Sequence, residues 1–282
     1  MKLLGTGLAV AVALIAAAPA VCAPAASPLN TDLGFATHTA EYAMSLNSTR
    51  MSGGVTSASG KMSYRFADTC DGWTVENKTA VTFAYVDSSP VATTWDYVTW
   101  ESKDGLRFRF RVRSTRDGNV SDEIIGTAVL DGRGKGGTVK FTKPEQKTMS
   151  LPAGTLFPTE HTRRLLEAAE KGGHMLAKVV FDGTDAGGPF NVNGIVTRLT
   201  PANSNSGSAI GKPGVNASLL SAPSWVMQLA FFPVGSDEAE PDYEIGLRYY
   251  LNGVADEMIQ SYGDFTLKAS LEKLQPLPKP DC

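Results

Sequence analysis

The feature that most constrains the fold of this chain is a long succession of strand-like segments separated by short turn signals. Segments rich in Thr, Val, Tyr, Phe and Trp recur over most of its 282 residues. Short links favour antiparallel pairing of consecutive strands, and rolling the sheet protects its edges. The sequence predicts a mainly β protein, a large antiparallel meander rolled into a barrel or an incompletely closed sheet. The expected strands are 35–48, 60–69, 73–86, 91–101, 106–113, 123–130, 137–142, 174–181, 190–199, 224–234, 242–251 and 254–271.

One main helix is expected at about 159–171. Thr159 follows a proline and is the expected N-cap, and Gly172 and Gly173 end the helix. Arg163 and Arg164 are expected to point to solvent.

Residues 200–222 interrupt the strand pattern. They are rich in Asn, Ser, Gly and Pro and lack periodicity, which predicts a long flexible loop. Because the strand pattern resumes after them, we do not place a domain boundary there.

The N-terminal residues 1–25 read as a secretory signal peptide. A lysine precedes an apolar run, and small residues of A-x-A pattern follow. The run is short for a transmembrane anchor. We expect cleavage after Ala25, which removes Cys22, although cleavage after Ala20 would retain it. A lipidated Cys22 is a third alternative, and the residues before it fit this poorly.

Removal of Cys22 leaves two cysteines, Cys70 and Cys282. An exported protein with two cysteines favours a disulfide, and no C-x-x-C pattern suggests redox chemistry. We therefore predict a structural Cys70–Cys282 bond.

Two hairpins can be aligned residue by residue. The Asn252-Gly253 pair fits a type I′ turn, which places Leu251 opposite Val254, Leu247 opposite Met258, Tyr243 opposite Tyr262, and Arg248 opposite Glu257. A turn at Asp104-Gly105 places Trp100 opposite Arg109 and Asp96 opposite Arg113.

The strand after the second turn alternates strictly between arginines and apolar residues. Phe108, Phe110 and Val112 share one face, and the other carries Arg107, Arg109, Arg111 and Arg113, which we call the arginine row. The row is either a solvated face with Asp96 and Trp100 as partial partners, or a surface for lipid phosphates, acidic glycan or an acidic protein.

Other chemistry finds little support in the sequence. The chain has a net charge of −3, so it lacks the overall positive potential of a typical nucleic-acid binder. His38, His161 and His174 stand at no metal-binding or catalytic spacing. We expect no metal, no cofactor and no nucleic-acid partner.

Several stretches resemble the EipB family of periplasmic cell-envelope integrity proteins. They are residues 64–77 (Tyr-Arg-Phe-Ala-Asp-Thr-Cys-Asp-Gly-Trp-Thr-Val-Glu-Asn), 99–108 (Thr-Trp-Glu-Ser-Lys-Asp-Gly-Leu-Arg-Phe), 157–161, 241–244, 250–254 and 262–265. The resemblance covers most of residues 26–282. It implies a single β-spiral domain, or broken barrel, with a disulfide from Cys70 to the C-terminal cysteine.

The resemblance also implies a function without enzymatic activity. It suggests an exported periplasmic protein that supports envelope integrity by binding a lipid, lipoprotein, peptide or partner protein, with a tetratricopeptide-repeat protein as one implied partner. An enzyme acting on peptidoglycan or lipid, and a purely structural interaction protein, are the alternatives. A cluster of Ser, His and Asp side chains with shifted pKa values would favour the enzyme.

Overall fold

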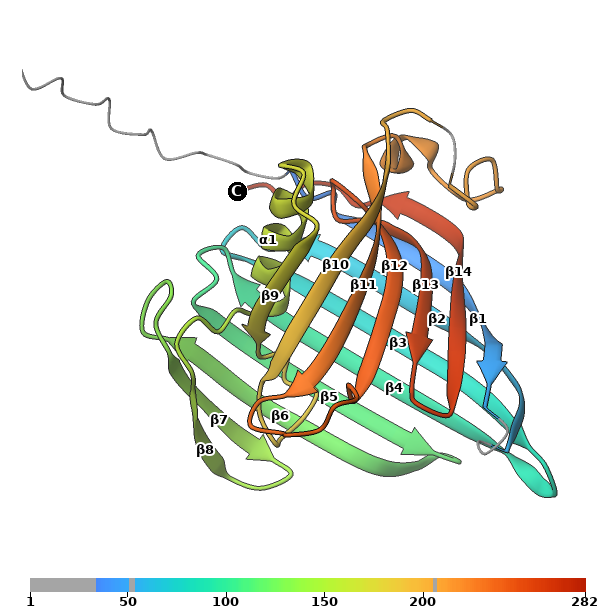
Figure 1. Cartoon of the computed structure of the whole chain (residues 1–282), viewed down its shortest axis with the longest axis horizontal. Coiled ribbons are helices and arrows are strands. Elements are labelled where there is room, and N and C mark those ends of the chain that lie inside the picture. The colour runs from blue at the N-terminus through green and yellow to red at the C-terminus, as the bar shows by residue number, and fades with distance from the viewer. Residues whose placement is uncertain (1–33, 51–53, 205–206) are drawn as a thin grey trace, which may run out of the picture. The chain divides into compact units, whose positions relative to one another are not determined.

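The strand-rich sequence folds into one antiparallel sheet in the computed structural model, which describes residues 34–50, 54–204 and 207–282 (Figure 1). A helix, α1 (Pro158–Glu170), and a short 3-10 helix, η1 (Ala217–Leu220), accompany it. The mainly β antiparallel fold with a main helix is therefore confirmed. The strands are β1 (His38–Thr49), β2 (Val55–Asp68), β3 (Gly72–Tyr85), β4 (Ser88–Ser102), β5 (Arg107–Arg116), β6 (Asn119–Leu130), β7 (Gly137–Lys143), β8 (Lys147–Leu151), β9 (Met175–Val180), β10 (Phe190–Thr200), β11 (Ser224–Pro233), β12 (Tyr243–Tyr250), β13 (Ala255–Ser261) and β14 (Phe265–Pro276).

The sheet consists of two meanders joined at a seam. Its order is β8-β7-β6-β5-β4-β3-β2-β1-β14-β13-β12-β11-β10-β9, so the first and last strands pair at its middle. The end strands β8 and β9 are not neighbours in this order, and the sheet stays open. This agrees with the expected broken barrel.

The Cys70–Cys282 disulfide lies beside this seam. Cys70 follows β2 in the turn to β3, and Cys282 ends the segment after β14. Its Sγ–Sγ distance is 2.02 Å, and the two residues are 212 apart in sequence. The bond therefore holds the C-terminal tail against the β2–β3 turn.

The inner face of the sheet carries the core, and β5 shows why. Phe108, Phe110 and Val112 are at most 3% exposed, whereas the arginines between them are exposed. Aromatic rings from other segments complete this packing, with Phe157 and Phe181 stacked on or set edge-on to Phe108. The alternation predicted for this strand is thus confirmed.

A turn after β9 links the two meanders through the interior. The Tyr97 hydroxyl on β4 donates to the Asp182 carbonyl over 2.8 Å, and the Tyr243 hydroxyl on β12 donates to the Asp182 carboxylate over 3.3 Å. At the seam side, the Tyr42 hydroxyl donates to the Ala255 carbonyl at the start of β13. In Figure 1 strands β10–β13 pass across β3–β5.

Helix α1 begins differently from the prediction. Phe157 is its N-cap residue, Pro158 opens the first turn, and no side chain from this segment caps it. The Glu101 carboxylate on β4 instead accepts the backbone N–H groups of Thr159 and Glu160, over 2.7 and 2.8 Å. The Glu101 carboxylate on β4 therefore caps the helix in place of the Thr159 side chain.

Arg163 and Arg164, expected to point to solvent, form ion pairs along the helix. Arg163 forms ion pairs with Glu160 and Glu167, and Arg164 reaches Glu160 over 2.9 Å. Ion pairing three and four residues along the helix explains the difference.

The sequence reading missed two features of the strands. It passed over β8, a five-residue strand that follows Pro144, and it merged β13 with β14. Residues Tyr262, Gly263 and Asp264 form the turn between the last two strands, where the Tyr262 N–H donates to the Phe265 carbonyl. Gly-Asp is a weaker turn signal than the Asn-Gly and Asp-Gly pairs found elsewhere in the chain.

The hairpin at Asn252-Gly253 has a wider turn than predicted. Tyr249 pairs with Ala255 and Leu247 with Met258, with a register shift between the two pairs. The predicted pairing of Leu251 with Val254 is wrong, because Tyr250 bonds to Val254 around a three-residue loop in which Gly253 has φ +82°. The predicted contact of Arg248 with Glu257 is present over 3.5 Å.

Residues 200–222 pack more than a free surface loop would, as far as they are described. Ala209, Leu219 and Leu220 are buried against β1, β2 and β14 residues, and the Asn216 N–H donates to the Leu274 carbonyl. The predicted signal peptide, 1–25, with Cys22, lies outside the described residues.

Candidate functional site

The arginine row lies on the outer face of β5 and contains part of the candidate site. Strand alternation directs all four arginines outward, and each is exposed. The Asp104-Gly105 hairpin has the predicted register, with Trp100 opposite Arg109 and Asp96 opposite Arg113. The structure therefore brings together every arginine that the sequence singled out.

Neighbouring strands give the four arginines different surroundings. Arg113 lies between Asp96 on β4 and Glu123 on β6. Arg111 lies between Val98 on β4 and Ile125 on β6. Arg109 is flanked by Trp100 and Thr127, and Arg107 faces Val129. Acidic neighbours thus lie at one end of the row, and apolar or uncharged neighbours along the rest.

The charges of the row are only partly neutralised. Arg111 forms an ion pair with Glu123 over 3.2 Å. Among the described residues, Arg107, Arg109 and Arg113 form no ion pair, so the expected charge contact between Asp96 and Arg113 is absent. The expected cation–π contact is present, with the Arg109 guanidinium carbon 4.1 Å from the centroid of the Trp100 ring.

Two lysines on β7 extend the positive surface. Register through β6 places Lys140 in line with Thr127 and Arg109, and Lys143 in line with Ile125 and Arg111. Neither lysine forms an ion pair with a described residue. We call the outward side chains Arg107, Arg109, Arg111, Lys140 and Lys143 the basic face.

The sequence reading missed these lysines for a specific reason. The β5–β6 pairing has a register shift between Ser114 and Thr115, and the β6–β7 pairing has another between Ile125 and Gly126 that displaces Lys143. Counting residues from the turns therefore does not align these lysines with the arginines. The exposed alternation of Lys140 with buried Val139 and Phe141 was the available signal.

Trp100 anchors the basic face to the disulfide-bonded turn. Its indole N–H donates to the Thr69 hydroxyl over 3.1 Å, one residue before Cys70. The Arg107 guanidinium carbon lies 5.9 Å from the same ring. The fixed indole therefore gives Arg109, and more distantly Arg107, an aromatic surface to lie against.

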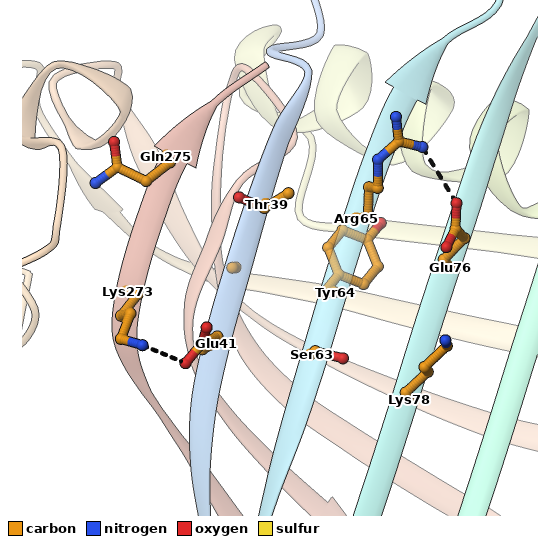
Figure 2. A pocket seen from close by; sticks show the side chains of 10 residues that line it. Thr39, Glu41, Ser63, Tyr64, Arg65, Glu76, Lys78, Lys273 and Gln275 are labelled. Carbon is orange, nitrogen blue, oxygen red and sulfur yellow. Dashed lines mark hydrogen bonds and ion pairs between the residues drawn. The ribbon is translucent and has the colours of Figure 1, made fainter.

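An open groove of about 390 Å³ occupies β14, β1, β2 and β3 on the same outer face (Figure 2). Figure 2 shows Lys273 reaching Glu41 and Arg65 reaching Glu76, over 2.9 and 3.2 Å. Lys78 lines the groove near Ser63. Acidic and basic side chains alternate there, so this groove lacks the one-sided charge of the basic face.

The buried acids Glu101 and Asp182 have raised pKa values. Burial raises the pKa of Glu101 to about 7, against the lowering effect of the N–H groups of Thr159 and Glu160. Burial also raises the pKa of Asp182, whose carboxylate accepts the N–H and the hydroxyl of Thr184. Both carboxylates hold backbone segments in place.

The buried histidine rings make few polar contacts within the part of the chain that the structure describes. The His38 ring contacts the Ala36 carbonyl, and burial lowers the pKa of His161 to about 4. His161 Nε2 is buried with no hydrogen-bond partner. No described histidine forms a hydrogen bond with a serine hydroxyl or a carboxylate, the two contacts by which a Ser-His-Asp triad is recognised.

Within residues 34–50, 54–204 and 207–282, no group of three or more His, Cys, Asp or Glu side chains could hold a metal ion. None of the described helices has the length and apolarity to cross a membrane.

Comparison with known proteins gives a consistent family. The EipB-like family model matches residues 30–278. The cell envelope integrity protein EipB of Brucella abortus (strain 2308) is 29% identical over 242 residues, covering 84% of this chain and 82% of the relative. A crystal structure of a β-barrel-like protein of a domain of unknown function from Brucella abortus superposes with a TM-score of 0.77 at 26% identity, covering 86% of this chain and 99% of that one.

Proposed function

The chain belongs to the EipB-like family, a cell envelope integrity family, and from this membership we propose that it is a non-enzymatic periplasmic protein that binds an anionic envelope component through its basic face. Its ligand carries phosphate or carboxylate groups. The binding contributes to the integrity of the envelope.

The observation that carries this proposal is the charge of the basic face, of which only Arg111 is paired with a described carboxylate. Five cations lie on β5 and β7, the two strands that flank β6, and Glu123 on β6 is the carboxylate that pairs with one of them. Arginine binds phosphate and carboxylate groups in a forked, two-bond geometry, and a rigid sheet keeps the cations in place before binding. The balanced groove of Figure 2 offers an anion no comparable advantage.

Lack of enzymatic activity is part of the proposal. The Glu101 and Asp182 carboxylates accept hydrogen bonds from backbone N–H groups, and the His161 ring is buried without a hydrogen-bond partner at Nε2. The described histidines contact no nucleophile. An enzyme acting on peptidoglycan or lipid remains the competing function. Turnover of either substrate by the purified protein would replace the proposal.

Anion binding can be tested without knowing the ligand, because the chain as a whole is acidic. With a net charge of −3, the protein should bind phosphocellulose at neutral pH only if its cations are clustered. We expect retention at low salt and elution as salt screens the contact. Arg109→Glu with Arg111→Glu should abolish retention.

The matched control lies on the same strand. Arg113→Glu with Arg116→Glu changes the net charge equally but leaves the basic face intact, so it should elute much closer to the wild type. Equal loss of retention in both double variants would show that overall charge, not the basic face, governs binding.

The periplasmic location has a separate test. The exported protein should begin near Ala26, as read by N-terminal sequencing. An acylated Cys22 would place it on a membrane and contradict this part of the proposal. A lipoprotein, a peptide and a tetratricopeptide-repeat protein are the partner classes that the family resemblance adds, and an acidic patch on any of them would suit the basic face.

A further inference from the structure

The cations of the basic face are interleaved with exposed apolar side chains. Val98, next to Arg111, is 38% exposed, and Val129, next to Arg107, is 50% exposed. Trp100 lies between them in register with Arg109. Because strand alternation points all these side chains outward, one surface carries both charge and apolar contact area.

The presence of both charged and apolar side chains helps to decide between two kinds of anionic partner, a dissolved polyanion and a lipid surface. A dissolved polyanion is bound by charge alone, and exposed valines contribute nothing to its binding. A lipid surface uses both, since basic residues meet anionic headgroups while apolar side chains and tryptophan enter the interfacial layer. The placement of Val98 and Val129 on the two sides of the row fits the lipid surface better.

We propose that the basic face docks on the surface of an anionic lipid bilayer, with Arg107, Arg109 and Arg111 at the headgroups and Trp100, Val98 and Val129 in the interfacial layer. This inference rests on the proposed function, because it names the component that the same face binds. Arg113 lies outside the docked area, because its neighbour Asp96 forms no ion pair with a described residue and would be repelled by the anionic surface, whereas Glu123 is already paired with Arg111.

The test is flotation of the mature protein with lipid vesicles. Vesicles of phosphatidylcholine and phosphatidylglycerol should carry the protein upward, whereas vesicles of phosphatidylcholine alone should not. Each basic residue near an anionic surface is worth roughly fivefold in binding. Arg109→Glu with Arg111→Glu should therefore reduce flotation by well over tenfold, and raised salt should weaken wild-type binding.

A second pair of variants tests the apolar part. Val98→Thr with Val129→Thr preserves charge and β-branched shape, so folding and phosphocellulose retention should be unchanged, while vesicle binding should fall severalfold. Circular dichroism confirms the fold of each variant. Unchanged vesicle binding in the threonine variant would contradict the interfacial contact.

The outcomes separate this inference from the proposed function. Retention on phosphocellulose without any vesicle binding would overturn the lipid surface and leave anion binding standing, which points to an acidic glycan or protein. Absence of both kinds of binding would overturn both proposals.

Discussion

The guanidinium of Arg109 lies over the indole ring of Trp100, with its central carbon 4.1 Å from the ring centroid. The two residues are directly opposed on β4 and β5, and the indole is held by its hydrogen bond to Thr69. One arginine of the row is therefore ordered by contact with a ring, while its charge stays available to an anion.

We predict that Trp100 and Arg109 are energetically coupled. A double-mutant cycle of Trp100→Leu and Arg109→Ala should give a coupling of about 0.5–1 kcal/mol in the free energy of unfolding. Urea unfolding of the four proteins measures it. A coupling indistinguishable from zero would mean that the stacking does not order Arg109.

The disulfide should stabilise the seam of the sheet. Cys282→Ser opens a loop that spans 212 residues, and the chain-entropy account assigns such a closure at most about 5 kcal/mol. We expect a lower melting temperature and faster proteolysis of the C-terminal tail. Non-reducing peptide mapping should recover Cys70 linked to Cys282, and two thiols open to alkylation in exported protein would contradict the bond.

Gly183 should tolerate no side chain. Its φ is +74°, and a Cβ atom there would lie 2.4 Å from the Phe110 ring. Gly183→Ala should therefore cost about 2–4 kcal/mol, from left-handed backbone strain together with overpacking. The loss would weaken the turn by which Asp182 joins β4 to β12.

Gly263 provides the matched control for Gly183. Its φ is +76°, and an added Cβ would meet nothing within 4 Å. Gly263→Ala should cost only the backbone strain, about 1–2 kcal/mol. Equal losses at the two positions would show that the Phe110 contact is unimportant.

The sequence predicted those parts of the fold that depend on local pattern. The alternation of β5 placed Phe108 inside and Arg109 outside, and the Asp104-Gly105 turn set the register that brings Trp100 to Arg109. Side-chain period and turn length determine these features directly. The disulfide followed from cysteine usage.

Features that depend on long-range packing were not predicted. Glu101 caps α1 from a strand 58 residues away, so no local signal at Thr159 could reveal it. Lys140 and Lys143 come into line with the arginines across β6, whose pairing with β5 and with β7 contains register shifts. The pairing of β1 with β14, which makes two meanders into one sheet, likewise has no local signature.

Glu101 should make stability depend on pH. An acid whose pKa rises from 4.5 to about 7 on folding binds more protons in the folded state. Its contribution is fully present below pH 4.5 and is lost as the pH rises through 7, a change of about 3 kcal/mol. Glu101→Gln removes this dependence.

The comparison must be made between variants, because His161 acts in the opposite direction. Its pKa is lowered to about 4, so it costs stability as the pH falls below 6.5 in both proteins. Urea unfolding gives the free energy of unfolding of wild type and of Glu101→Gln at each pH. The difference, wild type minus variant, should decrease between pH 5 and pH 8. A constant difference would contradict the raised pKa of Glu101.

The most direct test of the basic face is complementation of a deletion strain under detergent stress. Arg109→Glu with Arg111→Glu removes the contact with Trp100 and the ion pair with Glu123 but no buried side chain, so circular dichroism should stay native and the thermal transition should remain cooperative at a modestly lower temperature. We predict that this exported, folded variant fails to restore growth, whereas Arg113→Glu with Arg116→Glu restores it. Full rescue by the folded Arg109, Arg111 variant would contradict the account and return the arginine row to an ordinary solvated face.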